Sequence, residues 1–273
     1  MKTPGRLAGT LTALALLALL ASPGASAQAA AAPRKPVKPK TIVALTFDDG
    51  DATHAAAARM LEKHGMRGTF YVNSATIGID GKLTEGRLAA LARAGHEIGG
   101  HTLTHVRLNE LLPGEQRVQI CDDRRALMKL GHRVTTLAYP FGAVNADAEK
   151  TARLCGYNAA RAVSGLKQWS CPSCPGAESL PPADRWAVRA PGSIRDDTPV
   201  RHMRQQVVNA EKAGGGLVPL IFHMVCDDCG TYSTSPERLE EFLGWLEKRR
   251  GRGTVVRTMD QAIGGEARPL PAE

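Results

Sequence analysis

The sequence has 273 residues, of which 43% are hydrophobic, and this length and composition are enough for at least one well-packed domain. Its formal net charge of +8 comes mostly from the beginning of the chain, because six of the 35 basic residues and none of the 27 acidic residues lie in positions 1–40. The remainder is close to neutral, which argues against a nucleic-acid-binding protein, and we expect no nucleic-acid partner.

The beginning of the chain has the features of an export signal. In residues 1–27, two basic residues precede a short apolar run, and a small-x-small cleavage sequence ends at Ala27. The apolar run is short for a membrane span, so we predict cleavage and no stable membrane span afterwards, with an uncleaved N-terminal anchor as the alternative. Residues 28–40, rich in alanine, proline and positive charge, are expected to form a linker. A folded domain at 41–263 and a tail at 264–273 would then belong to a secreted, cell-wall or periplasmic protein.

Six cysteines lie beyond the predicted signal peptide, and an even number in an exported protein favours disulfides. The preferred pairing joins Cys121 to Cys155, each on a predicted helix. Two C-x-x-C pairs then remain to close their own loops or to join one another. A structural zinc site made from these two pairs is the alternative. The pairs are Cys171 with Cys174 and Cys226 with Cys229.

From residue 41 onward, short apolar runs alternate with amphipathic segments. Strands are predicted at 41–47, 67–72, 96–100, 135–139, 157–163, 186–189, 217–222 and 253–256. Helices are predicted at 51–64, 84–95, 114–130, 147–155, 198–213 and 235–248, with a short one starting at 258 and a loop at 164–185. This alternation predicts an α/β domain with mostly parallel strands, specifically a deformed (β/α) barrel of about seven units. An open doubly wound sheet is the alternative, although no G-x-G-x-x-G follows the first strand.

Three predicted strands end on residues that can do chemistry. The first ends on Asp48 and Asp49, and because neighbouring strand residues point to opposite sides, we expect different tasks for the two carboxylates. The third leads into His101 and His105, which would share one face if the segment turned helically, and a later strand ends on His223. Two imidazoles and a carboxylate form a metal site that leaves positions open for substrate. An ordinary Asp-Gly turn after the first strand is the alternative interpretation of the carboxylate pair.

These residues carry a resemblance to a known family. Four segments occur in the order of the polysaccharide deacetylase family, the NodB-homology domain or carbohydrate esterase family four. They are Thr46-Phe-Asp-Asp-Gly50, His101-Thr-Leu-Thr-His105, Tyr139-Pro-Phe-Gly142 and Leu220-Ile-Phe-His223. The resemblance covers nearly all of residues 41–263. It implies a deformed (β/α) barrel that removes acetyl groups from mostly N-acetylated polysaccharides with a divalent metal, commonly zinc.

The resemblance also implies a role for each matching residue. Asp49, His101 and His105 would bind the metal. Asp48 would be the general base and His223 the general acid that protonates the departing amine. The remaining matching residues would contact substrate: Tyr139, Pro140, Phe141, whose backbone N–H would stabilise the oxyanion, and Ile221, which would line the pocket for the acetyl methyl group.

The third segment departs from the family pattern. An arginine that orients the base often stands where this chain has Ala138, and Phe141 replaces the usual tyrosine. We hypothesise that Arg189 supplies the missing positive charge.

Three other functions compete with deacetylation of an N-acetylated glycan such as peptidoglycan, chitin or poly-N-acetylglucosamine. An esterase that removes O-acetyl groups from a xylan-type polymer would use the same site. A catalytically silent glycan-binding domain would not need the five acidic and imidazole side chains, and an aromatic content of 4% leaves few stacking platforms. A thiol oxidoreductase is disfavoured because neither C-x-x-C pair lies between a strand and a helix.

Overall fold

The computed structural model of this chain describes residues 40–270. The predicted signal peptide and nearly all of the predicted linker lie outside these residues. In the described part of the chain, no helix is both long enough and apolar enough to cross a lipid bilayer.

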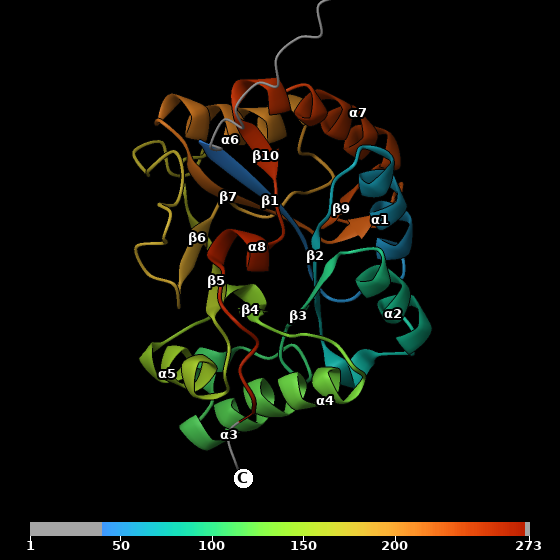
Figure 1. Cartoon of the computed structure of the whole chain (residues 1–273), viewed down its shortest axis with the longest axis vertical. Helices are drawn as coiled ribbons and strands as arrows, with labels where there is room; N and C mark the ends of the chain where they lie inside the picture. The colour runs from blue at the N-terminus through green and yellow to red at the C-terminus, as the bar shows by residue number, and fades with distance from the viewer. Residues whose placement is uncertain (1–39, 271–273) are drawn as a thin grey trace, which may run out of the picture. The chain divides into compact units, whose positions relative to one another are not determined.

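Parallel strands form a nearly closed barrel (Figure 1), as the alternation of strands and helices predicts. Seven strands follow one another around the barrel in the order β7-β1-β2-β3-β4-β5-β6, and β10 pairs with the first three residues of β1. Their bounds are β1 Thr41–Phe47, β2 Thr69–Val72, β3 Glu97–Gly100, β4 Thr136–Ala138, β5 Ala159–Gly165, β6 Val188–Ala190, β7 Gly216–Phe222 and β10 Thr254–Val256.

The barrel is deformed where β6 and β7 meet. In place of a ladder between these strands, the backbone N–H of Ile194 donates a hydrogen bond to the carbonyl of Ile221 at 2.8 Å. Glu178, in the preceding loop, forms an antiparallel bridge with Leu217 of β7. β6 and β7 are therefore linked by these single contacts, without a ladder between them, next to the loop that carries Cys171 and Cys174.

Helices cover the outside of the barrel, and their caps agree with the sequence signals. The side chains of Thr84, Asn145, Ser235 and Thr258 accept hydrogen bonds from backbone N–H groups of the helices that follow them. The helices are α1 His54–Lys63, α2 Glu85–Arg93, α3 Pro113–Arg117, α4 Asp123–Lys129, α5 Ala146–Leu154, α6 Val200–Lys212, α7 Pro236–Glu247 and α8 Met259–Ile263. The predicted helix at 114–130 is therefore present, but a π-helical segment at Val118–Asp122 joins α3 to α4.

Side chains alternate between two cores because strand residues point alternately outward and inward. Val43, Leu45 and Phe47 of β1 belong to the large core under the helices. Ala44 belongs to a smaller core inside the barrel, together with Tyr71 of β2. Met259 of α8 is also part of this inner core.

Three disulfides occur among the described residues, and they confirm the preferred pairing. Cys121 is bonded to Cys155, which ties the π-helical segment to the end of α5. Each C-x-x-C pair closes its own loop, so the alternative of a structural zinc site made from these four cysteines is wrong.

Two short elements after β7 were not predicted. β8 (Met224–Val225) and β9 (Ser233–Thr234) pair with each other and enclose the loop that the second C-x-x-C disulfide closes. The described part of the predicted tail lacks regular structure but contacts the barrel. The carbonyls of Glu266 and Arg268 accept hydrogen bonds from Asn158 and Arg124.

Candidate active site

A carboxylate and two imidazoles meet at the carboxyl end of the strands. Asp49 follows β1, and His101 and His105 follow β3. Oδ1 of Asp49 lies 3.3 Å from Nε2 of His101 and 3.1 Å from Nε2 of His105. Each of the three residues offers one possible ligand atom, and these three atoms all lie within 4.8 Å of one another. The structure therefore brings together the three residues that the sequence nominated as metal ligands.

The donor groups of this cluster fit a divalent cation. Nδ1 of His101 donates a hydrogen bond to the carbonyl of Ala138 at 2.7 Å, which leaves Nε2 facing Asp49. A ligating histidine is commonly oriented by such a bond on its other ring nitrogen. Oδ1 of Asp49 is buried and has no hydrogen-bond partner in the described chain. Such an orphaned acceptor between two imidazoles is what a cation site requires.

The two imidazoles come together without a helical turn, which was the condition under which the sequence placed them on one face. Residues 101–105 form an irregular loop in which Thr102 and His105 have φ angles of 66° and 57°. The rings nevertheless approach edge to face, with centroids 4.9 Å apart. The amide of Asn73 fixes this loop by donating to the carbonyls of His101 and Thr102. The condition of a helical turn is therefore not met, and left-handed residues bring the rings together instead.

The carboxylate of Asp123 holds the start of the loop at 101–105. Its carboxylate accepts hydrogen bonds from the backbone N–H groups of Ser74 at 2.8 Å and His101 at 3.0 Å. The π-helical segment ends directly before Asp123, and such segments often occur at functional sites. Burial raises the pKa of Asp123 to about 6 even though these N–H groups favour the carboxylate.

The other carboxylate of the pair, Asp48, lies inside the barrel and is almost wholly buried. Strand β1 ends at Phe47, so simple alternation does not separate the two carboxylates as expected. They separate because Asp49 adopts a left-handed conformation, with φ at 74°. The two carboxylates have different partners, as the sequence predicts.

Asp48 is held by an arginine that the sequence analysis missed. Nη2 of Arg161 lies 2.6 and 2.5 Å from the two carboxylate oxygens of Asp48, and the arginine side chain is completely buried. Burial alone would raise the pKa of Asp48, but the guanidinium of Arg161 and the nearby imidazoles of His101 and His223 together outweigh burial and hold the pKa below its ordinary value. The carboxylate is therefore kept ionised inside the barrel.

Arg161 stands next to the position where the family arginine is absent. On adjacent strands β4 and β5, Ala138 and Arg161 are direct partners in register. The small side chain of Ala138 thus lies beside a guanidinium that comes from the neighbouring strand. A lone arginine inside the apolar strand at 157–163 was the sequence signal that could have identified this residue.

The hypothesis that Arg189 orients Asp48 is wrong. Its guanidinium pairs with Glu178, with Nη2 lying 2.8 Å from Oε1. The carboxylate of Glu178 is buried and also accepts backbone hydrogen bonds around the turn at Ser179–Ala183. Arg189 therefore stabilises this loop rather than the general base.

His223 follows β7 and faces the same end of the barrel. Its Nδ1 is buried without a hydrogen-bond partner in the described chain, and burial lowers the pKa of its imidazole despite the nearby carboxylates Asp48 and Asp49. The carbonyl of His223 accepts a hydrogen bond from Nε2 of His54 at 2.8 Å. His54 is completely buried against Phe47, so it is a core residue that positions the backbone of His223.

Of the four residues expected to contact substrate, only Phe141 exposes its side chain, by 54%. Tyr139 is completely buried in the large core, where it packs against other apolar side chains, and its expected contact with substrate stays a prediction. Pro140 and Ile221 are also buried, and Ile221 lies in register with Thr46 of β1. A role for Ile221 against an acetyl methyl group stays a prediction.

Exposed aromatic rings flank the cluster on two sides. The ring of Phe141 lies 4.5 Å from that of His105 and beneath the guanidinium of Arg107. Phe141 has a φ of 58° and occupies the second position of a 3-10 turn, where backbone N–H groups lack partners within the turn. On the other side, the ring of Tyr232 lies 5.1 Å from that of His223.

Comparisons with known proteins agree with this geometry. Residues 35–160 match the model of the polysaccharide deacetylase family. Over 117 residues, the chain is 34% identical to the putative polysaccharide deacetylase YxkH of Bacillus subtilis, a match that covers 42% of each protein. It is 32% identical over 107 residues to the peptidoglycan-N-acetylmuramic acid deacetylase PdaC of Bacillus subtilis, covering 38% of this chain and 22% of PdaC. The chain thus spans less than half the length of these two curated relatives.

A solved structure extends the likeness beyond the matched residues. The family 4 carbohydrate esterase from Streptomyces lividans, in complex with acetate, aligns with a TM-score of 0.53 and 16% identity, covering 85% of this chain and 100% of that chain. At this identity the likeness concerns the fold. Residues 35–160 therefore match the polysaccharide deacetylase family, and the chain folds as a deformed (β/α) barrel.

Proposed function

We propose that this protein is an exported, divalent-metal-dependent hydrolase that removes acetyl groups from an N-acetylated polysaccharide. One observation carries the proposal: a buried carboxylate held by a guanidinium lies beside a carboxylate and two imidazoles at the open end of the barrel. Structural metal sites are usually closed by protein ligands, whereas three protein ligands leave room for a water and a substrate.

Asp49, His101 and His105 would hold the cation, and zinc suits this set of two imidazoles and one carboxylate. When bound, the cation would supply a Lewis acid that polarises the acetyl carbonyl and lowers the pKa of a water. Asp48, kept ionised by Arg161, would accept a proton from the attacking water.

Two further groups would complete the reaction. The backbone N–H of Phe141 would donate a hydrogen bond to the carbonyl oxygen as that oxygen gains negative charge. His223 would donate a proton to the nitrogen of the sugar as its bond to the acetyl carbon breaks. The products would be acetate, which takes its new oxygen from water, and the free amine of the polysaccharide.

Export and substrate class rest on separate supports. The pattern of residues 1–27 and three disulfides among the described residues favour a secreted, cell-wall or periplasmic protein, since disulfides persist in oxidising compartments. The similarity to PdaC, a peptidoglycan-N-acetylmuramic acid deacetylase, supports an N-acetylated glycan as substrate.

The test is acetate release from N-acetylglucosamine oligomers, peptidoglycan and acetylated xylan. Protein stripped with a chelator and then reloaded with zinc should release acetate from an N-acetylated substrate only after reloading. His101→Ala should abolish release, whereas His64→Ala, which removes a histidine paired with glutamates on α7, should retain it. Equal release by stripped protein would refute the proposal, and release from acetylated xylan alone would assign an O-acetyl esterase instead.

A further inference from the structure

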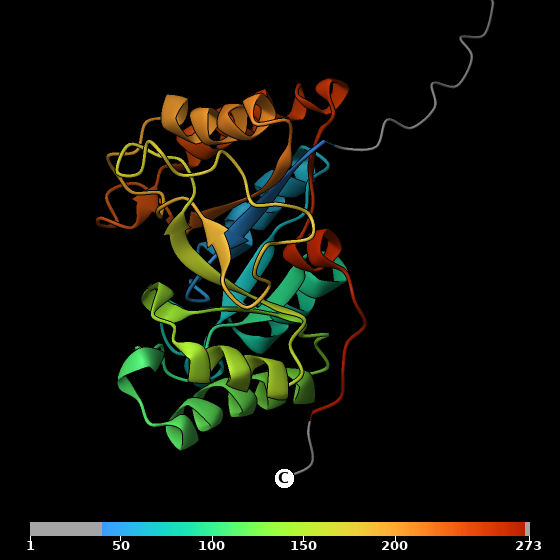
Figure 2. The same cartoon turned by 90° about the vertical axis from the view of Figure 1, so that its left-hand side faces the viewer.

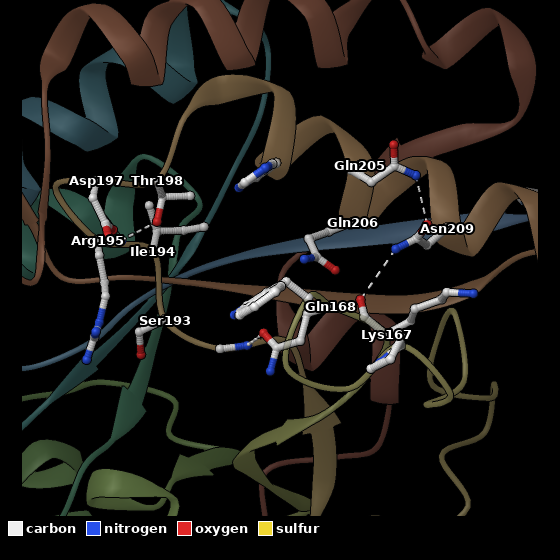
Figure 3. A pocket seen from close by; sticks show the side chains of 14 residues that line it. Lys167, Gln168, Ser193, Ile194, Arg195, Asp197, Thr198, Gln205, Gln206 and Asn209 are labelled. Atoms are coloured by element: carbon white, nitrogen blue, oxygen red, sulfur yellow. Dashed lines mark hydrogen bonds between the residues drawn. The ribbon is translucent and has the colours of Figure 1, made fainter.

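A hollow lies beside α6, apart from the side-chain cluster of the candidate active site. Its volume is about 760 Å³, within the range typical of small-molecule sites. The walls are one face of α6, the loop that carries the disulfide Cys171–Cys174, and the segment after β6. Figure 2 shows the β5–β6 loop beside α6, and Figure 3 shows the side chains that line the hollow.

The face of α6 towards the hollow is lined by side chains that both donate and accept hydrogen bonds. His202, Gln205, Gln206 and Asn209 recur at intervals of three and four residues, which places them on one side of the helix. Met203 and Val207 point to the core instead. A helix face that presents three carboxamides to a hollow offers paired donors and acceptors without net charge.

Two of the three carboxamides on α6 are bonded, because Gln205 donates a hydrogen bond to Asn209 at 2.8 Å and Asn209 donates one to the carbonyl of Lys167 at 3.4 Å. The side chain of Gln206 makes no hydrogen bond to another described residue, and in Figure 3 its amide extends from α6 towards Gln168 of the facing loop. Oε1 of Gln168 accepts a hydrogen bond from the N–H of Gly192 at 2.7 Å, which leaves its NH₂ group free to donate. The hollow is thus lined on two facing walls by amide groups that have no hydrogen-bond partner in the described chain: the carboxamide of Gln206 and the NH₂ group of Gln168.

An exposed tryptophan stands at the edge of the same hollow. Trp169 is 94% exposed, which is unusual for the largest apolar side chain. It lies on a turn in which Gln168 and Cys171 exchange backbone hydrogen bonds, and a disulfide from Cys171 to Cys174 closes the segment that follows. The fold therefore holds the indole in solvent on a braced loop instead of burying it.

The hollow is connected to the candidate active site by direct contacts. Arg195, which lines the hollow, places its guanidinium 5.1 Å from the ring centroid of Tyr232 and donates a hydrogen bond to its hydroxyl at 3.2 Å. The ring of Tyr232 in turn lies 5.1 Å from that of His223. A polymer that reacts near His223 could therefore reach the hollow by passing over Tyr232.

We propose that this hollow is a saccharide-binding subsite that holds a sugar ring of the same polysaccharide chain, a few rings away from the one that is deacetylated. The proposal rests on the proposed function, because it takes that substrate as the occupant. A pyranose ring presents an apolar C–H face, which the indole of Trp169 can cover, and a rim of hydroxyl groups. Those hydroxyl groups both donate and accept hydrogen bonds, as do the carboxamides of Gln168 and Gln206.

The test is calorimetric binding of N-acetylglucosamine oligomers of two and six rings to zinc-loaded protein that carries Asp48→Asn, so that no substrate is consumed. We expect the six-ring oligomer to bind about tenfold more tightly than the two-ring oligomer. Trp169→Ala and Gln206→Ala should each remove most of this advantage. Leu154→Ala, an exposed apolar residue on α5, and Arg201→Ala, an exposed residue on α6, serve as controls that should keep it.

Equal binding of the two oligomers, or an advantage that survives Trp169→Ala, would overturn the subsite. An equal loss in both control variants would also overturn it, because the effect would then not belong to the hollow. Failure of the proposed function is a separate result. If folded, zinc-loaded protein releases no acetate while six-ring binding still depends on Trp169, the deacetylase is refuted and the subsite stands.

Discussion

Replacing Arg161 tests the feature of the site that sequence patterns did not supply. Arg161→Met keeps a long side chain but removes the guanidinium, so Asp48 is left as a buried carboxylate without its partner. Nη2 contacts both oxygens, at 2.6 and 2.5 Å, and the two side chains are 0% and 4% exposed. Removing one member of a buried ion pair costs about 3–5 kcal/mol of folding stability. Loss of a correctly placed base lowers turnover by about 10²–10⁴-fold.

Two measurements separate the structural effect from the catalytic one. Urea unfolding gives the free energy of unfolding, and acetate release by zinc-loaded protein gives kcat. Arg161→Lys is the milder variant if Arg161→Met does not fold, because it keeps the charge but loses the planar fork. Arg189→Met is the matched control. Its guanidinium pairs with Glu178, so we expect reduced stability and a kcat within about threefold of the unaltered protein.

A double-mutant cycle with Asp48→Asn then isolates the pair. Because each single change leaves one buried charge unpaired, the double variant should be more stable than the two single losses predict, by about 1–3 kcal/mol. Unchanged kcat in a folded Arg161→Met protein would refute the positioning role. If the loss of unfolding free energy in the double variant equalled the sum of the two single losses within about 0.5 kcal/mol, the two residues would not stabilise one another.

Three other changes test the surrounding fold. Burial raises the pKa of Glu97 to about 6 from an ordinary 4.5, so the folded state holds this proton more tightly than the unfolded chain. As pH rises from 4 to 7, the unfolding free energy of the unaltered protein should fall by about 2 kcal/mol more than that of Glu97→Gln. If urea unfolding gave the same pH dependence of the unfolding free energy for both proteins, this prediction would be contradicted. Replacing both Cys121 and Cys155 by alanine should lower the unfolding free energy by about 3–4 kcal/mol, because the disulfide joins residues 34 positions apart. A loss under about 1 kcal/mol would contradict this prediction. Gly100→Ala should lower the unfolding free energy by about 1–3 kcal/mol, because a Cβ at this position would lie 2.0 Å from a buried tyrosine hydroxyl. Gly114→Ala is the control, since a Cβ there would meet nothing within 4 Å. Equal stability of the two variants would contradict the packing argument.

Local signals explain why most elements could be predicted from the sequence. Hydroxyl residues at 84, 235 and 258 cap the helices that follow them, and glycines at 65 and 95 adopt left-handed conformations just beyond helix ends. β8 and β9 escaped prediction because each has two residues, too few for a periodic pattern.

The site was predicted as far as its residues follow directly after strands. Asp49, His101 and His105 could be placed together because parallel strands present their carboxyl ends at one end of a barrel. Arg161 could not, since its contact with Asp48 spans 113 positions and depends on the register between β4 and β5. The left-handed conformations of Asp49 and His105 were equally out of reach, because neither is a glycine and no local pattern requires them.

The most direct test of the proposed mechanism measures zinc content and acetate release on the same samples. Asp48→Asn should retain about one zinc per chain and lose at least about 100-fold in release from the preferred N-acetylated substrate, because the base is removed while the ligands remain. His101→Ala should lose both zinc and activity. If Asp48→Asn released acetate at the rate of the unaltered protein, or if His101→Ala stayed active without zinc, the assignment of a general base beside a metal site would be contradicted.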